Sequence, residues 1–175
     1  MARMFNKKIC LRGEFGVGKT SLVRRFVHDL FSDDYITTLG VKVTEKVLPP
    51  IEKNGKPHQY RFMIWDIAGT EEGRIQHESY WTGASGALIV ADLCRPDTFA
   101  HAKKIMDHFL AINPGASVVI AGNKADLIQR QEIAAHEKTL KEIAGEISRP
   151  VFITSAKSGL SVEESFIGLA EGMLA

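Results

Sequence analysis

A glycine-rich run near the N-terminus, Gly13-Glu-Phe-Gly-Val-Gly-Lys19-Thr20, constrains the fold of this chain more than any other feature. It follows an apolar run at 8–12 and precedes a helical pattern at 19–30, so we expect a strand, a loop and a helix in that order. Glycines allow backbone N–H groups to curl around phosphate oxygens, and the helix N-terminus adds positive potential. Lys19 would reach the β- and γ-phosphates of a nucleotide, and the Thr20 hydroxyl would bind Mg²⁺. The residues predicted to bind phosphate are Gly13, Glu14, Phe15, Gly16, Val17, Gly18, Lys19, Thr20 and Ser21.

Apolar runs of strand length alternate with helical patterns along the rest of the 175 residues. Continuous apolar strands separated by helices indicate a mainly parallel sheet that is covered on both faces. Asn54-Gly55 predicts a hairpin turn, so two neighbouring strands would form one antiparallel edge. We therefore expect one domain, residues 1–175, with a three-layer α/β fold and a mainly parallel six-stranded sheet. Strands are expected at 8–12, 41–47, 60–64, 87–91, 117–121 and 151–154, and helices at 19–30, 98–112, 132–147 and after Ser161. Leu30 is expected on the inner face of the first of these helices, and Ser161 is expected to cap the last.

The composition argues against several classes of function. Hydrophobic residues make up 45% of the chain, and the formal net charge of +1 gives no argument for binding nucleic acid or an anionic membrane. No apolar segment is long enough to span a membrane, and the N-terminus lacks a signal peptide. Cys10 and Cys94 lie in apolar runs and are predicted to be buried thiols, which suits a reducing cytoplasm. We therefore expect a cytoplasmic monomer with no intrinsic membrane anchor in this chain.

Asp66 ends an apolar run, at the edge of the sheet where the phosphate-binding loop is expected. A strand-end aspartate by itself is more often a helix cap or a turn residue. Beside a phosphate-binding loop, however, its carboxylate can hold Mg²⁺ through a water, because Mg²⁺ keeps several of its waters. Asp66 is therefore predicted to be a metal ligand together with Thr20.

The segment Asn123-Lys124-Ala125-Asp126 follows a predicted strand and favours guanine over adenine. Guanine presents adjacent N1–H and 2-amino donors, which a fixed carboxylate such as Asp126 can accept bidentately. Asn123 would brace the loop and meet the other edge of the base, and the stem of Lys124 would lie on the ring face. A backbone N–H at Ala156 would donate to guanine O6, although a polar strand-to-helix connection would also explain that loop. The predicted guanine-binding residues are Asn123, Lys124, Asp126, Ser155, Ala156 and Lys157.

These loops, in this order and spacing, resemble those of the Ras superfamily of small GTPases over nearly the whole chain. The segments WDIAGTEE, SYWTGASGALIVADL and YITTLGV are similar to Rab proteins in particular. The resemblance implies a P-loop GTPase that binds GDP or GTP with Mg²⁺ and hydrolyses GTP. It also implies a switch: GTP orders residues 32–43 and 68–82, and protein effectors and regulators recognise the ordered shape.

The same resemblance assigns roles to individual residues. Thr38 is similar to the threonine that binds Mg²⁺ and senses the γ-phosphate, so the implied metal ligands are Thr20, Thr38 and Asp66. Phe31 and Tyr35 match aromatic residues near the guanine and over the phosphates, although Phe31 could instead be a core residue. Gly69 would lie in a hinge near the γ-phosphate. The residues with implied roles in catalysis are Lys19, Thr38 and Thr70.

Two residues depart from the family pattern near the reacting phosphate. Thr70 occupies the position of the glutamine that orients the attacking water, and threonine is too short to reach in the same way. Phe15 stands where Ras and Rho members usually carry glycine, and its ring would occupy space that an activating partner's arginine enters. Slow intrinsic hydrolysis is therefore expected. Glu71, Glu72 and Arg74 offer an alternative water-orienting group, although such charges more often form a solvated surface.

Other features leave alternatives open. Residues 48–58 are a few residues longer than usual in the family and are either a partner surface or a tolerated hairpin extension. The C-terminal residues EGMLA carry no cysteine for a lipid, so membrane association would need a lipidated tail beyond this sequence. A GTP-binding adaptor with negligible hydrolysis is the alternative to a GTPase switch. Residues 123–126 disfavour a P-loop ATPase or kinase.

Overall fold

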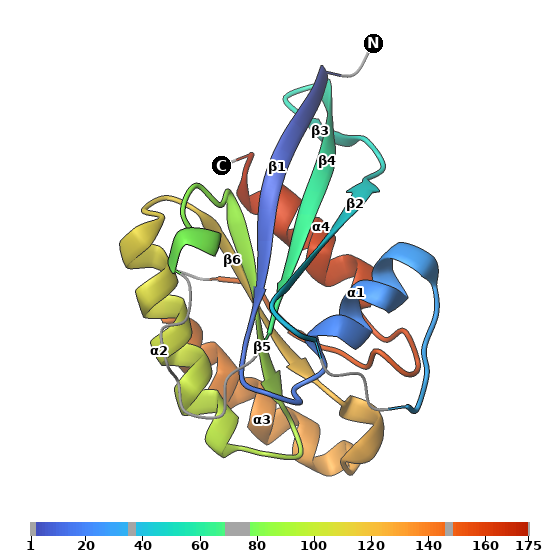
Figure 1. Ribbon diagram of the computed structural model, residues 1–175. Coiled ribbons are helices and arrows are strands. Elements are labelled where there is room, and N and C mark those ends of the chain that lie inside the picture. Colours follow the sequence, from blue (N-terminus) through green and yellow to red (C-terminus); the bar gives the residue numbers. More distant parts are fainter. Residues whose placement is uncertain (1–2, 35–37, 69–77, 146–148, 175) are drawn as a thin grey trace.

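A twisted β-sheet forms the centre of the molecule in the computed structural model, which describes residues 3–34, 38–68, 78–145 and 149–174 (Figure 1). The sheet order is β2-β4-β1-β5-β6-β7, and the short strand β3 pairs with β4. Neighbours in the run β4-β1-β5-β6-β7 are parallel, whereas β2 and β3 are antiparallel to β4. The strands are β1 (Arg3–Arg12), β2 (Val41–Val47), β3 (Ile51–Lys53), β4 (Lys56–Ile67), β5 (Gly86–Asp92), β6 (Ser117–Asn123) and β7 (Val151–Ile153).

Helices cover both faces of this sheet (Figure 1). Side chains of α1 and α4 pack with one face in a first core, and side chains of α2 and α3 pack with the other in a second. Phe26 and Phe166 stack in the first core with ring centroids 3.9 Å apart. Phe109 is fully buried in the second, and burial of each such side chain contributes about 1.5–3 kcal/mol. The helices are α1 (Lys19–His28), α2 (Asp97–Ile112), α3 (Arg130–Ala144) and α4 (Val162–Gly172), with 3₁₀ turns η1 (Glu78–Tyr80) and η2 (Ala125–Leu127).

The predicted fold class is confirmed, with a seventh strand that was not expected. Asn54 and Gly55 form the predicted hairpin turn, both with positive φ angles (52° and 70°), which suits a tight turn between antiparallel strands. Pro49-Pro50 ends β2, since proline cannot donate to a strand ladder. The chain then resumes pairing with β4 as β3. Among the described residues, no helix is both long and apolar enough to cross a membrane.

Three local predictions are wrong. Leu30, expected on the inner face of the first helix, is 54% exposed, because α1 ends at His28 and Asp29 turns the chain in a left-handed conformation. Cys94 is exposed, because it follows β5 and lies beyond the end of the buried run. Ser161 precedes α4, but its side chain makes no capping hydrogen bond. By contrast, Cys10 is buried as predicted, and burial raises the pKa of its thiol to about 11.

Candidate nucleotide-binding site

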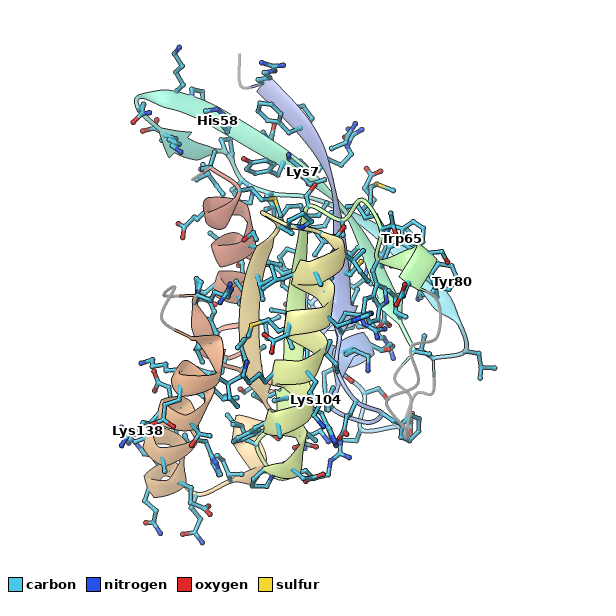
Figure 2. All side chains as sticks on the ribbon, turned by 90° about the vertical axis from the view of Figure 1, so that its left-hand side faces the viewer. Lys7, His58, Trp65, Tyr80, Lys104 and Lys138 are labelled. Atoms are coloured by element: carbon cyan, nitrogen blue, oxygen red, sulfur yellow. The ribbon has the colours of Figure 1, made fainter. Side chains whose placement is uncertain are left out.

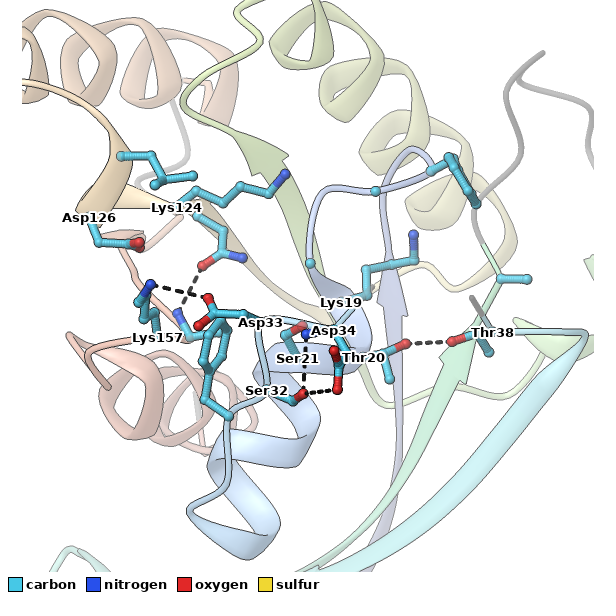
Figure 3. Close-up of a pocket in the computed structure, with 18 residues that line it drawn as sticks. Lys19, Thr20, Ser21, Ser32, Asp33, Asp34, Thr38, Lys124, Asp126 and Lys157 are labelled. Atoms are coloured by element: carbon cyan, nitrogen blue, oxygen red, sulfur yellow. Dashed lines mark hydrogen bonds and ion pairs between the residues drawn. The ribbon is translucent and has the colours of Figure 1, made fainter. Parts of the chain in front are cut away.

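A cavity lies beyond the carboxyl ends of the parallel strands, where ligands bind in sheets of this kind (Figure 3). Most residues predicted to bind nucleotide meet here. The lining includes Phe15, Gly16, Gly18, Lys19, Thr20, Ser21, Phe31, Thr38, Asn123, Lys124, Asp126, Ala156 and Lys157. Five further lining residues are Ser32, Asp33, Asp34, Ala68 and Leu127. The predicted residues that do not line the cavity are Gly13, Glu14, Val17, Asp66 and Ser155. Tyr35, Gly69 and Thr70 lie outside the described residues.

The phosphate loop, residues 13–20, connects β1 to α1 and curls around the Lys19 side chain. The Lys19 ammonium donates hydrogen bonds to the carbonyl oxygens of Gly13 at 2.9 Å and Glu14 at 2.8 Å. Gly18 has a φ of 100°, and a Cβ at this position would collide with the Asn123 amide, so only glycine fits. The loop therefore keeps the backbone close to neighbouring strand ends and holds a cation at its centre.

Burial sets the protonation behaviour of Lys19. The side chain is only 6% exposed, and burial lowers its pKa to about 8, with nearby Asp66 acting in the opposite direction. Carbonyl oxygens satisfy its hydrogen bonds but do not neutralise its charge. A phosphate placed in the loop would supply that negative charge, and so would stabilise the protonated lysine.

Three oxygen-bearing side chains from separate segments meet at the end of α1 that faces the cavity. The Thr20 hydroxyl donates to Oδ2 of Asp66 at 2.5 Å, and the hydroxyl oxygens of Thr20 and Thr38 lie 2.5 Å apart (Figure 3 shows this pair). Oδ1 of Asp66 is buried and has no hydrogen-bond partner among the described residues, and burial raises the pKa of this carboxyl group. Hard oxygen donors around an unsatisfied carboxylate oxygen fit Mg²⁺, which prefers such ligands. The three predicted metal ligands are therefore brought together.

Asn123 joins three loops at the opposite end of the cavity. Its amide nitrogen donates to the Val17 carbonyl oxygen at 3.0 Å in the phosphate loop. Its amide oxygen accepts hydrogen bonds from the Thr154 hydroxyl at 3.2 Å and the Ala156 N–H at 3.3 Å. Asn123 is 1% exposed, so these bonds satisfy an amide that is otherwise costly to bury. The Ala156 N–H was expected to donate to guanine O6, but in the structure it donates to the Asn123 amide oxygen.

Asp126 presents its carboxylate at the rim of the cavity, in the base loop, residues 123–126. Ser155 donates its hydroxyl to Oδ1 of Asp126 at 2.5 Å and accepts the Ser158 N–H at 3.1 Å. This chain of bonds fixes the direction of the carboxylate, although Asp126 itself is exposed. Phe31 and Lys157 also line the cavity, and the Lys157 ammonium lies 6.0 Å from the Phe31 ring centroid.

Several residues that hold the site together were not predicted. Asp92 ends β5 with 1% exposure, and its Oδ2 accepts the Lys124 ammonium at 2.6 Å and Arg95 Nε at 3.0 Å. Arg95 in turn donates from Nη2 to the Phe15 carbonyl oxygen at 2.8 Å, and the Glu14 carboxylate contacts the His101 ring of α2. Asp92 thus links the base loop to the phosphate loop. The available signal was an acid at the end of an apolar strand, the same signal that identified Asp66.

Arg25 of α1 supports the loop after β7. Its Nε donates to the Ala156 carbonyl oxygen at 2.8 Å, and its Nη2 donates to the Lys157 carbonyl oxygen at 2.6 Å. Because α1 also begins in the phosphate loop, one helix positions residues at both ends of the cavity. The apolar periodicity that predicts this helix from the sequence gives no indication that Arg25 contacts the loop after β7.

A parallel sheet whose first strand leads into a phosphate loop, with a fixed carboxylate across the same cavity, defines a P-loop nucleotide-binding protein. A family model described as the Ras family matches residues 8–175. Ras-related protein Rab-1C of Dictyostelium discoideum is 37% identical over 93% of this chain and 78% of that protein. Human Ras-related protein Rab-31 is 37% identical over 93% of this chain and 80% of its own length, and GTP-binding protein YPTM2 of Zea mays is 34% identical. The chain belongs to the Ras family and is Rab-like, which confirms the predicted resemblance.

Proposed function

We propose that this chain is a single-domain guanine-nucleotide switch that binds GDP and GTP with Mg²⁺ and hydrolyses GTP slowly. The observation that carries the proposal is the meeting of a phosphate loop and the Asp126 carboxylate at opposite ends of one cavity. A guanine base against Asp126 leaves its phosphates directed toward Lys19, because the two residues line the same cavity. Family membership supports a small GTP-binding switch in general terms.

The residues of the site divide into those for the base and those for the phosphates. Asp126 accepts the two adjacent donors of guanine, and Lys19 neutralises charge on the β- and γ-phosphates. Thr20 and Thr38 would hold Mg²⁺ directly, and Asp66 through a water. When bound, the metal neutralises charge on the phosphate oxygens. Thr38 belongs to residues 32–43, so its contact with the metal site would tie that segment to the nucleotide state.

Residues 32–43 and 68–82 are the proposed surface for effectors and regulators. In the described part of these segments, Leu39 is 89% exposed and Val43 is 45% exposed, which leaves apolar area for a partner to cover. Trp65 of β4 and Tyr80 of η1 lie beside each other at the edge of this surface, with ring centroids 6.2 Å apart (Figure 2). Aromatic side chains of this kind contribute strongly to protein interfaces.

The nucleotide identity is the first test of the proposal. Purified protein is denatured by heat, and the released nucleotide is identified by chromatography. We expect GDP or GTP, because the base loop provides a carboxylate that matches guanine and has no matching partner on adenine. Release of ADP or ATP would overturn the proposal.

Thr70→Gln is expected to accelerate single-turnover GTP hydrolysis by at least about tenfold, because a glutamine would orient the attacking water and threonine is too short. The measurement is phosphate release from GTP-loaded protein. Thr139→Gln, an exposed change of the same kind on α3, is the matched control and should leave the rate unchanged. A wild type at least as fast as T70Q would show that another group already orients the water.

A GTP-binding adaptor with negligible hydrolysis is the second candidate function, because Phe15 lines the phosphate end of the cavity. Its ring would obstruct an incoming arginine, a group that contributes about 10³- to 10⁵-fold to the rate in this class. Multiple-turnover phosphate release by the wild type and by Phe15→Gly, with and without a candidate activating protein, separates the two. Turnover by the wild type supports the switch, whereas turnover by F15G alone supports the adaptor.

A further inference from the structure

Arg95 lies in the loop between β5 and α2 and contacts the phosphate loop from behind. Its Nη2 donates to the Phe15 carbonyl oxygen at 2.8 Å. Phe15 and Gly16 line the cavity, whereas Arg95 is not among the lining residues. Its Nε donates to Oδ2 of Asp92 at 3.0 Å, and Asp92 is 1% exposed. The guanidinium is therefore held between a buried carboxylate and one carbonyl group of the phosphate loop.

The peptide unit that joins Phe15 to Gly16 separates Arg95 from the phosphate end of the cavity. In a planar trans peptide the C=O and N–H bonds point in opposite directions. The Phe15 carbonyl accepts from the guanidinium, so the Gly16 N–H points away from Arg95. Because Gly16 lines the cavity, that direction leads toward the space in which a phosphate would lie. Gly16 also has a left-handed φ of 74°, which helps to turn successive N–H groups toward one anion.

A charged donor on one side of this peptide strengthens the donor on the other side. Hydrogen bonds that form a chain polarise one another, and the effect is larger where water is excluded. The Arg95 guanidinium draws electron density toward the Phe15 carbonyl oxygen, so the Gly16 N–H presents more positive charge to a phosphate oxygen. A charge-assisted hydrogen bond also fixes the orientation of the peptide. Arg95 can therefore act on a bound phosphate without touching it.

We propose that Arg95 is a positioning residue for the phosphates of the bound nucleotide and that it acts through the peptide between Phe15 and Gly16. It fixes the direction of the Gly16 N–H and increases its strength as a donor. Asp92 holds the guanidinium in place and also accepts the Lys124 ammonium at 2.6 Å, so one carboxylate anchors both ends of the site. The inference rests on the proposed function, because it concerns the phosphate end of the same cavity.

The test compares wild type, Arg95→Met and Arg95→Lys with three separate ligands: GDP with Mg²⁺, inorganic pyrophosphate with Mg²⁺, and guanosine. R95M is expected to lose about three- to tenfold in affinity for GDP and pyrophosphate, and nothing for guanosine. This loss is smaller than that of a direct charge-assisted hydrogen bond, because Arg95 acts through a peptide. R95K should show an intermediate loss, since one ammonium keeps the charge but does not reproduce the guanidinium fork.

The Gly16 amide gives a readout that a merely structural role would not move. In the amide NMR spectrum of wild type, binding of pyrophosphate should shift the Gly16 proton downfield, as expected for a strong hydrogen bond to phosphate. In R95M this shift should be smaller, because the N–H is a weaker donor. Arg3→Met is the matched control, because Arg3 lies at the far end of β1 and contacts the Phe5 ring. R3M should keep the wild-type shift and affinities.

Three outcomes overturn the inference. The first is an affinity of R95M for GDP and pyrophosphate within twofold of wild type, and the second is an unchanged shift of the Gly16 proton. The third is an equal loss for guanosine and pyrophosphate, because Arg95 would then act on the base loop through Asp92. A wild type that binds pyrophosphate but no guanine nucleotide contradicts the proposed function instead, and the pyrophosphate comparison then decides the role of Arg95.

The fold of R95M should survive, because Asp92 keeps other partners. Its carboxylate still accepts the Lys124 ammonium at 2.6 Å and the Cys94 N–H at 2.9 Å. Thermal unfolding of the nucleotide-free proteins checks this expectation. An R95M protein that no longer folds, with R95K binding all three ligands as wild type does, would mean that Arg95 serves the fold alone, and would overturn the inference.

Discussion

Replacing Asp126 with asparagine is expected to lower the affinity for GDP and GTP by about 10²- to 10⁴-fold, the loss of two hydrogen bonds to a charged acceptor. Asparagine offers one carbonyl oxygen and an NH₂ group in place of two acceptors. The NH₂ group would then face the 2-amino group of guanine, donor against donor. The measurement is the dissociation constant for each nucleotide, by displacement of a fluorescent analogue.

The same variant is expected to prefer xanthine nucleotides, which carry an oxygen where guanine carries the 2-amino group. That oxygen can accept a hydrogen bond from the asparagine amide, so the lost pairing is restored. Asp107→Asn is the matched control, since Asp107 is an exposed acid on α2 paired with Lys103 at 2.7 Å, outside the cavity lining. Unchanged guanine affinity in D126N would exclude Asp126 as the base-reading residue.

The parallel half of the fold could be predicted because its strands are buried on both faces. Residues 87–91 and 117–121 are continuous apolar runs, and both lie within strands of the structure, β5 and β6. The extent of β1 was not predictable in the same way. Residues 3–7 carry no clear alternation, and they form a strand because β4 pairs with them, from Arg3 opposite His58 onward. Whether a segment of this kind forms a strand depends on a pairing partner that is distant in the chain, and the pattern of its own residues does not determine it.

The candidate site was predictable where chemistry follows the end of a strand. The residues of the phosphate loop suit phosphate, Asp66 suits a metal ion and Asp126 suits guanine. All of them lie at or just after the ends of strands, where ligands bind in a sheet of this topology. Asp92, Arg95 and Arg25 were missed because their roles are contacts across the chain. Arg95, for instance, reaches the Phe15 carbonyl oxygen from a loop 80 positions away in sequence. Only the folded arrangement shows which polar residues are adjacent.

Arg12 shows a different limit. In the sequence it is one charged residue at the end of an apolar run, and such residues usually point to solvent. Its burial depends on Trp81, which follows η1 and covers the guanidinium from a distant part of the chain. The unusual feature is therefore a combination of burial, an aromatic partner and the lack of a counter-charge within the described residues, and none of these can be read from a local pattern.

Lys19→Met is expected to lower the affinity for both GDP and GTP by about 10²- to 10⁴-fold, because its ammonium would make charge-assisted hydrogen bonds to phosphate oxygens. Methionine keeps the length and the apolar stem of lysine and removes only the charge and the donors. The measurement is the nucleotide content of the purified protein, followed by titration with GDP and a GTP analogue. Lys141→Met is the matched control, since Lys141 is exposed on α3 and paired with Glu137 at 2.6 Å.

The fold of K19M should survive, and the reason is the direction of the Lys19 pKa shift. Burial lowers this pKa from 10.5 to about 8, so the charged lysine opposes folding. That penalty is fully present below pH 8 and disappears as the pH rises through 10.5. At pH 7 the substitution removes the penalty, so the nucleotide-free K19M protein should be at least as stable as nucleotide-free wild type. Guanine-nucleotide affinity in K19M equal to that of K141M would contradict the assignment of Lys19 to the phosphates, and a folded K19M protein makes that comparison decisive.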